Sequence, residues 1–222
     1  MPALFRRRFG AVFLLTTVFV VIATLTRAAL LLHTTDSGLT FIATLAAFAI
    51  GLGYDLVTAA YFSIPLIVYL TLLPERALRS RTHSALLQFG FFATLYLLLF
   101  VAVSEWVFWD EFESRFNFIA VDYLVYTNEV LGNIWESYPV PALLTVIGAV
   151  TLLVFLPLRP YLRSRGPAQP LAQRLRGAAL LLCVPAFATL GIDGSMAAFS
   201  TNRYANELAG NGIYSFFAAF RN

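Results

Sequence analysis

Five polar residues near the middle of the chain could act together on a polar ligand. Asp122, Tyr126, Glu129, Asn133 and Glu136 follow one another at intervals of four, three, four and three residues, which places them on one stripe of an α-helix. This acidic stripe could bind a lipid head group, dock another domain or, through its carboxylates, take part in catalysis. The same pattern is typical of an amphipathic helix whose polar side faces water at a membrane surface, so these interpretations stay open.

The segment that contains the acidic stripe, residues 105–139, is polar and aromatic within an apolar chain. Its charged side chains are seven acids and one base: Glu105, Asp110, Glu111, Glu113, Asp122, Glu129, Glu136 and Arg115. Tryptophan, tyrosine and phenylalanine accompany them throughout, and Trp and Tyr are enriched where a membrane meets water. We therefore expect an interfacial helical loop that lies on a membrane without crossing it.

Two ionisable residues, Arg27 and Asp55, lie inside long apolar runs. Such groups are costly in a bilayer and normally pair with each other or face a polar cavity. The length of the arginine side chain would allow the two to meet. An ion pair that joins the first two helices and a site for a lipid or a proton are both compatible with this intramembrane pair.

Familiar catalytic and metal-binding signatures do not occur. The sequence has no G-x-S-x-G, H-E-x-x-H or P-loop motif. Its single cysteine, Cys183, lies in an apolar run, and its two histidines, His33 and His83, flank different predicted spans on opposite sides. The sequence therefore predicts no catalytic residue and no metal site in this chain.

The composition is that of a membrane protein. Of the 222 residues, 59% are hydrophobic and 12% are charged, whereas a soluble domain has about 25% charged residues. All fifteen basic residues are arginine, and most lie in short segments between apolar runs, where they set orientation in the membrane. Nucleic acid is therefore not expected as a partner.

The apolar runs predict an all-α integral membrane protein with five transmembrane helices, at about 9–32, 42–73, 84–104, 140–158 and 177–192. About 20 apolar residues cross a hydrocarbon core of about 30 Å. The first run is too long for a signal peptide, whose apolar region has about 7–15 residues. We expect a transmembrane domain over residues 1–193, with the outer loop 105–139 between the third and fourth helices, and an outer interfacial linker over 194–222.

The arginines also predict the orientation. They occur before the first span and in the second and fourth linkers: Arg6, Arg7, Arg8, Arg76, Arg79, Arg81, Arg159, Arg163, Arg165, Arg174 and Arg176. The first linker has none and the third has only Arg115. The positive-inside rule then predicts an N-terminus inside and a C-terminus outside, so that the loop and the tail from Asp193 onwards share the outer face.

Two segments resemble a known family. Residues 115–139, RFNFIAVDYLVYTNEVLGNIWESYP, look like the outer loop of bacterial lipoteichoic acid synthase-like phosphoglycerol transferases, which belong to the sulfatase and alkaline phosphatase superfamily. Residues 202–222, NRYANELAGNGIYSFFAAFRN, resemble the segment that leads from the fifth helix of those enzymes into their extracytoplasmic catalytic domain. The predicted five-helix topology agrees, so the resemblance covers the whole chain.

The resemblance implies a function for this region. The family moves phosphoglycerol from phosphatidylglycerol to an envelope polymer or glycan, through a phosphorylated threonine beside a divalent metal, manganese or magnesium. Those residues belong to a domain that would follow Asn222. The chain is therefore expected to lack catalytic residues and cofactors of its own. It would anchor that domain and present its substrate at a bacterial inner membrane, with membrane lipids, including phosphatidylglycerol, and the catalytic domain as partners.

Two alternatives remain beside this expectation. The chain could be a stand-alone lipid-binding or regulatory membrane module. It could also be the anchor of a lipid A phosphoethanolamine transferase, because those enzymes likewise carry five helices ahead of a related catalytic domain.

Overall fold

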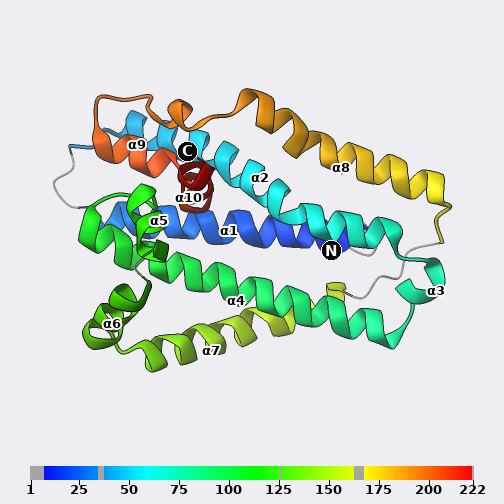
Figure 1. The fold of residues 1–222 in the computed structure, drawn as a ribbon. Helices are drawn as coiled ribbons and strands as arrows, with labels where there is room; N and C mark the ends of the chain where they lie inside the picture. Colours follow the sequence, from blue (N-terminus) through cyan, green and yellow to red (C-terminus); the bar gives the residue numbers. More distant parts are fainter. Residues whose placement is uncertain (1–7, 35–37, 126, 163–167, 222) are drawn as a thin grey trace.

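The computed structural model describes residues 8–34, 38–125, 127–162 and 168–221, and every regular element among them is a helix. Five helices are long and apolar enough to cross a membrane (Figure 1): α1 (Gly10–His33), α2 (Phe41–Leu72), α4 (Arg81–Phe112), α7 (Val140–Leu158), which continues into η2 (Arg159–Leu162), and α8 (Leu171–Gly191). The chain is thus a multi-pass membrane protein.

The five long helices are arranged around α1. Figure 1 shows α1 between α2 and α4, with α7 beside α4 and α8 beside α2, and these neighbours are in contact. Leu14 and Leu15 of α1 pack with Leu87, Phe91 and other residues in the largest apolar cluster. The helices are apolar on most of their circumference, as is typical of helices that face lipid as well as one another.

The short helices lie at the two ends of this bundle. The end that we call the tail end carries α5 (Phe118–Val125), α6 (Thr127–Ser137), η3 (Gly194–Ala197), α9 (Arg203–Ala209) and α10 (Gly212–Arg221) (Figure 1). The opposite end, which we call the arginine end, carries α3 (Glu75–Leu78). There Glu75 accepts a hydrogen bond from Arg8 at 2.5 Å and forms an ion pair with Arg174 at 3.3 Å. This contact joins the start of α1 to α3 and α8.

The third long helix continues past the boundary expected from the sequence. α4 begins after Ser80, whose hydroxyl accepts a hydrogen bond from the His83 N–H at 3.0 Å, and ends only where Glu113 adopts a left-handed conformation with φ of 48°. The segment before Glu113 contains no proline or glycine after Gly90, so nothing in the backbone interrupts the helix. Glu105 therefore lies on a transmembrane helix and not at the start of a loop.

Two other expected boundaries differ from those observed. α8 begins directly after Pro170, so it includes Arg174 and starts earlier than the span expected at 177–192. The helix expected to carry the acidic stripe is divided into α5 and α6. Periodicity alone does not distinguish one helix from two successive helices of similar phase.

Candidate functional site

Arg27 and Asp55 form a buried ion pair between α1 and α2. The Arg27 Nη1 and Nη2 atoms donate hydrogen bonds to the two Asp55 carboxylate oxygens at 2.7 and 2.9 Å. Both residues are 0% exposed. Gly51 lies one turn before Asp55, and a Cβ atom there would clash with the Arg27 guanidinium. The absence of a side chain at Gly51 therefore leaves room for the Arg27 guanidinium. The pair is bidentate, which is the strongest geometry for an arginine and a carboxylate.

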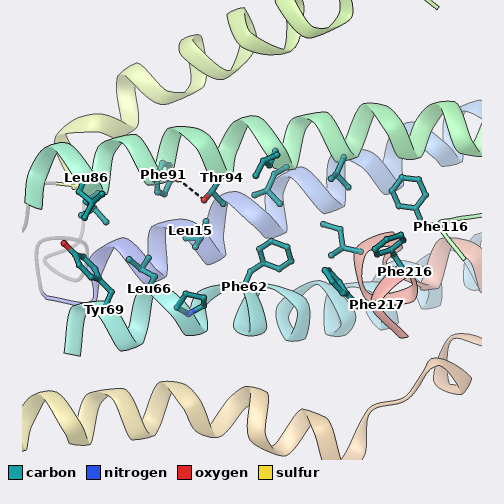
Figure 2. Close-up of a pocket in the computed structure, with 17 residues that line it drawn as sticks. Leu15, Phe62, Leu66, Tyr69, Leu86, Phe91, Thr94, Phe116, Phe216 and Phe217 are labelled. Carbon is teal, nitrogen blue, oxygen red and sulfur yellow. Dashed lines mark hydrogen bonds between the residues drawn. The ribbon is translucent and has the colours of Figure 1, made fainter. Parts of the chain in front are cut away.

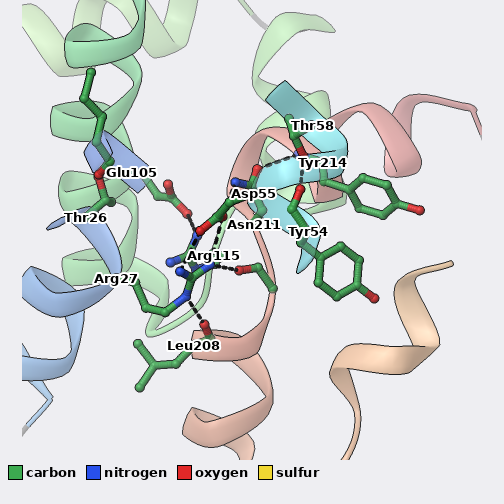
Figure 3. Close-up of polar contacts among 12 residues, drawn as sticks. Thr26, Arg27, Tyr54, Asp55, Thr58, Glu105, Arg115, Leu208, Asn211 and Tyr214 are labelled. Atoms are coloured by element: carbon green, nitrogen blue, oxygen red, sulfur yellow. Dashed lines mark hydrogen bonds and ion pairs between the residues drawn. The ribbon is translucent and has the colours of Figure 1, made fainter. Parts of the chain in front are cut away.

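The tail completes the hydrogen bonding of this pair (Figure 3). Arg27 Nε donates to the Leu208 carbonyl at 2.8 Å, and Nη2 also donates to the Gly210 carbonyl at 3.1 Å. The Asn211 side-chain amide donates to Asp55 Oδ1 at 2.8 Å. The carbonyls lie at the C-terminal end of α9, where a helix carries partial negative charge. The Arg27 guanidinium, which lies inside the bundle, thus binds the C-terminal end of α9, a helix of the tail.

A second buried pair lies beside the first. Arg115, just after α4, approaches Glu105 of α4 with 3.2 Å between Nη1 and Oε1, and the two residues are 2% and 4% exposed. Burial lowers the pKa of the Arg115 guanidinium below its usual value, while the nearby Glu105 carboxylate opposes that shift. The backbone N–H of Arg115 also donates to Glu207 Oε2 at 2.9 Å. A Cβ atom at Gly212 would clash with the Glu105 carboxylate, so the backbone of the tail reaches this carboxylate only because position 212 is glycine.

We refer to Arg27, Asp55, Glu105, Arg115 and Asn211 as the buried charge cluster. Among the described residues, Arg115 Nε and Nη2 have no hydrogen-bond partner. A small cavity of about 20 Å³ lies against Glu105, Arg115 and Asn211. A cavity of this size has room for one water molecule, which would bond to the free Arg115 donors. It is too small for a phosphate group.

Further contacts hold the tail to the long helices. The Tyr54 hydroxyl of α2 donates to the Asp193 carbonyl, and the Tyr214 hydroxyl of α10 donates to the Ile192 carbonyl at 2.8 Å. The rings of Tyr54 and Tyr214 lie 5.0 Å apart, edge to face. The Tyr204 hydroxyl of α9 donates to the Glu113 carboxylate at 2.8 Å, and this hydrogen bond raises the pKa of Tyr204. The tail is therefore attached to α2 and to the end of α4 at several separate points.

The acidic stripe is not brought into this cluster. Asp122 lies on α5, and Glu129, Asn133 and Glu136 lie on α6; all four are exposed. Tyr126, the fifth residue of the stripe, lies outside the described residues. α5 is nevertheless in contact with α10, so the stripe and the tail occupy the same end of the molecule.

The sequence interpretation identified Arg27 and Asp55 but not their partners. For Glu105 and Arg115, one signal was available, because Arg115 is the single base among seven acids of its segment. For the tail, the signal was the run Gly210-Asn211-Gly212, in which a polar side chain stands between two residues that allow close backbone approach. Neither signal indicates which residues are the partners.

The described residues contain no group of three or more His, Cys, Asp and Glu side chains that could hold a metal ion. His33 lies 2.9 Å from Asp110 at the tail end, and His83 lies 2.9 Å from Tyr69 near the arginine end. No family model, curated protein or solved structure matches this chain.

Proposed function

We propose that this chain is the membrane region of a phosphoglycerol transferase-like enzyme. It would hold the segment that precedes the catalytic domain against the outer surface of a bacterial inner membrane and present the lipid donor there. The observation that carries this proposal is the attachment of the tail to the Arg27–Asp55 pair through the Leu208 and Gly210 carbonyls and the Asn211 amide.

The tail forms three hydrogen bonds with the charged groups of this buried pair. A hydrogen bond to a charged group contributes about 1.5–3 kcal/mol. A tail held in this way gives the chain that follows it a defined starting position and direction. Tethering also raises the effective concentration of a catalytic domain next to a membrane-bound substrate.

The orientation proposed from the arginines agrees with this function. Arg76, Arg79 and Arg81 lie at the arginine end, close to the contact between Arg8, Glu75 and Arg174. If that end faces the cytoplasm, the tail end faces outwards. The exposed carboxylates of α5 and α6 would then lie beside the tail, where they would meet the catalytic domain or its substrate.

The two rival functions differ from this one in what they require. A stand-alone lipid-binding or regulatory module requires only a lipid site, and the apolar groove described below favours that possibility. The anchor of a lipid A phosphoethanolamine transferase requires phosphatidylethanolamine as the donor. The identity of the lipid donor and the length of the open reading frame therefore distinguish the three candidate functions.

The first test is to read the coding DNA beyond Asn222. We expect an open frame that continues into a sulfatase-like domain with a threonine nucleophile and metal ligands. The full-length protein should then convert labelled phosphatidylglycerol, and not labelled phosphatidylethanolamine, into diacylglycerol. A frame that ends near Asn222, or consumption of phosphatidylethanolamine alone, would refute the proposal.

The second test concerns the anchor itself. In the full-length protein, Asn211→Ala should lower phosphoglycerol transfer several-fold while the protein remains in the membrane, because the tail loses its contact with Asp55. Asn128→Ala, which changes an exposed residue of α6 outside the acidic stripe, is the matched control and should leave transfer unchanged. Replacing the whole region by an unrelated five-helix anchor should lower transfer further, and unchanged rates would show that this region does no more than attach the domain.

A further inference from the structure

A long apolar groove lies between α2 and α4. Both helices pack against α1, which leaves a space of about 590 Å³ with α1 as its floor. Figure 2 shows Leu15 of α1 behind the groove, Phe62 and Leu66 of α2 on one side and Phe91 of α4 on the other. Its volume is that of a small-molecule binding site, about 300–1,000 Å³.

The two hydroxyl groups that line the groove already form hydrogen bonds within the protein. The Thr94 hydroxyl donates to the Gly90 carbonyl of its own helix at 2.8 Å. The Tyr69 hydroxyl is 2.9 Å from His83 Nδ1. The other lining side chains are aliphatic or phenylalanine. A polar ligand would lose its bonds to water without replacement, so the groove favours an apolar occupant.

The shape of the groove favours a chain over a compact molecule. Its lining residues on α4 extend from Leu86 to Val101, which at 1.5 Å per residue corresponds to about 22 Å along the helix axis. The groove therefore runs parallel to the helices through most of a hydrocarbon core of about 30 Å. At this depth the surrounding material is lipid, and an extended acyl chain matches both the length and the chemistry.

Three phenylalanines close the groove at the tail end. Phe116 follows α4, and Phe216 and Phe217 belong to α10 (Figure 2). The small cavity against Arg115 lies next to this end and shares Leu98, Val101 and Ile213 with the groove. Because its volume is about 20 Å³, a lipid phosphate cannot enter it, and the head group of a bound lipid must remain at the membrane surface.

We propose that the groove binds one acyl chain of a membrane phospholipid and selects for the chain and not for the head group. The bound chain contacts Phe216 and Phe217, so it also supports α10 against α4. This site differs from a donor site, which must distinguish phosphatidylglycerol from other lipids. The proposal rests only on the membrane placement of the long helices and not on transferase activity.

Two glycine substitutions test the site with matched chemistry. Gly90 lines the groove and Gly53 lies on an exposed face of α2 outside it; a Cβ atom at either position would have no neighbour within 4 Å. Gly90→Leu places a leucine side chain in the groove without a backbone clash, and Gly53→Leu adds the same side chain elsewhere. After purification in mild detergent, Gly90→Leu should retain one phospholipid fewer per protein by mass spectrometry than Gly53→Leu and the unchanged protein. Equal retention would overturn the proposal.

A second measurement on the unchanged protein avoids any effect of substitution on folding. Phosphatidylglycerol and phosphatidylethanolamine with the same photoreactive acyl chain are each reconstituted with the protein and illuminated. We expect both lipids to label α4 between Leu86 and Val101 and the phenylalanines of α10 to the same extent. Labelling spread evenly over all five long helices would refute the groove as a site. Labelling of the groove by phosphatidylglycerol alone would refute the proposed indifference to the head group.

Discussion

The buried charge cluster and the acidic stripe lie at the same end of the bundle and contain similar side chains, but their surroundings differ completely. Arg27 and Asp55 are 0% exposed, whereas Asp122, Glu129 and Glu136 face the surroundings. The buried charges come from apolar runs (Arg27 and Asp55) and from residues 105–139 (Glu105 and Arg115), and they connect the long helices to the tail. The exposed acids of α5 and α6 are left available for other contacts.

The difference follows from the cost of an unpaired charge. In an apolar interior, such a charge is so unfavourable that it must obtain partners from any part of the chain that can reach it. For Arg27 these partners are Asp55 and two carbonyls of the tail. An exposed carboxylate is solvated by water, and a surface ion pair contributes only about 0–1 kcal/mol. Position in the sequence therefore says less about the role of a charge than its environment does.

The largest expected effect is from breaking the intramembrane pair. Asp55→Ala leaves the Arg27 guanidinium without its carboxylate, and we expect the free energy of unfolding in detergent to fall by about 3–5 kcal/mol. The measurement is thermal or denaturant unfolding, with Asp122→Ala as the exposed control, for which we expect a change within about 0.5 kcal/mol.

A double-mutant cycle sharpens the same comparison. Arg27→Leu combined with Asp55→Leu should cost clearly less than the sum of the single substitutions, because the double variant leaves no uncompensated charge. Strictly additive losses would show that the two side chains do not depend on each other.

The second effect comes from displacing the tail without removing a charge. Gly212→Ala places a methyl group against the Glu105 carboxylate, and overpacking of this kind costs about 1–3 kcal/mol. Amide hydrogen exchange in α10 should become faster while exchange in α1 remains slow. Gly194→Ala is the matched control, because a Cβ atom there would have no neighbour within 4 Å. Unchanged exchange in α10 would contradict the close approach of the tail to Glu105.

A smaller effect concerns pH at the start of the tail. Hydrogen bonds from the Ser195 hydroxyl and backbone N–H hold the pKa of Asp193 below its ordinary value of 3.8. Because the folded-state pKa is depressed, this local stabilisation is present above pH 3.8 and is lost as the pH falls through the folded value. Protection of the Ser195 amide should therefore exceed that in Asp193→Ala near neutral pH, and the difference should vanish in acid. A difference that persists in acid would contradict a role for the carboxylate.

The smallest expected effect is that of the acidic stripe on stability. Glu129→Gln and Glu136→Gln together should change the free energy of unfolding by less than about 0.5 kcal/mol, because both side chains are exposed on α6. If the chain is the enzyme anchor that we propose, the same substitutions should also lower phosphoglycerol transfer by that enzyme, because the stripe would meet the catalytic domain or its substrate. A large loss of stability would instead show that the stripe takes part in folding.

Much of the membrane architecture could be predicted from the sequence, because a long apolar run directly indicates a helix that can cross a membrane. The five spans and the proximity of Arg27 to Asp55 are found in the structure, since a costly charge in an apolar run restricts its possible partners. The continuation of α4 past Glu105 was not predicted, because an acid in an aromatic segment suggested a loop. That acid is accommodated by Arg115, and local periodicity contains no information about this contact.

The attachment of the tail could not be predicted for a similar reason. Asn211 and Asp55 are 156 residues apart, and spacing rules extend only over neighbouring turns of one helix. Gly51 and Gly212 likewise appear as ordinary glycines until the side chains that occupy the adjacent space are known. Long-range polar contacts of this kind depend on the packing of several helices at once.

The separation of these partners along the chain also imposes an order on biosynthesis. Arg27 and Asp55 are 28 residues apart and can pair while the third long helix is still on the ribosome. The Leu208 carbonyl, 181 residues after Arg27, is made only after all five long helices have been synthesised. Arg27 therefore enters the bilayer before all of its hydrogen-bond acceptors have been synthesised. The tail, which is made last, then supplies the missing acceptors to a residue of the first helix.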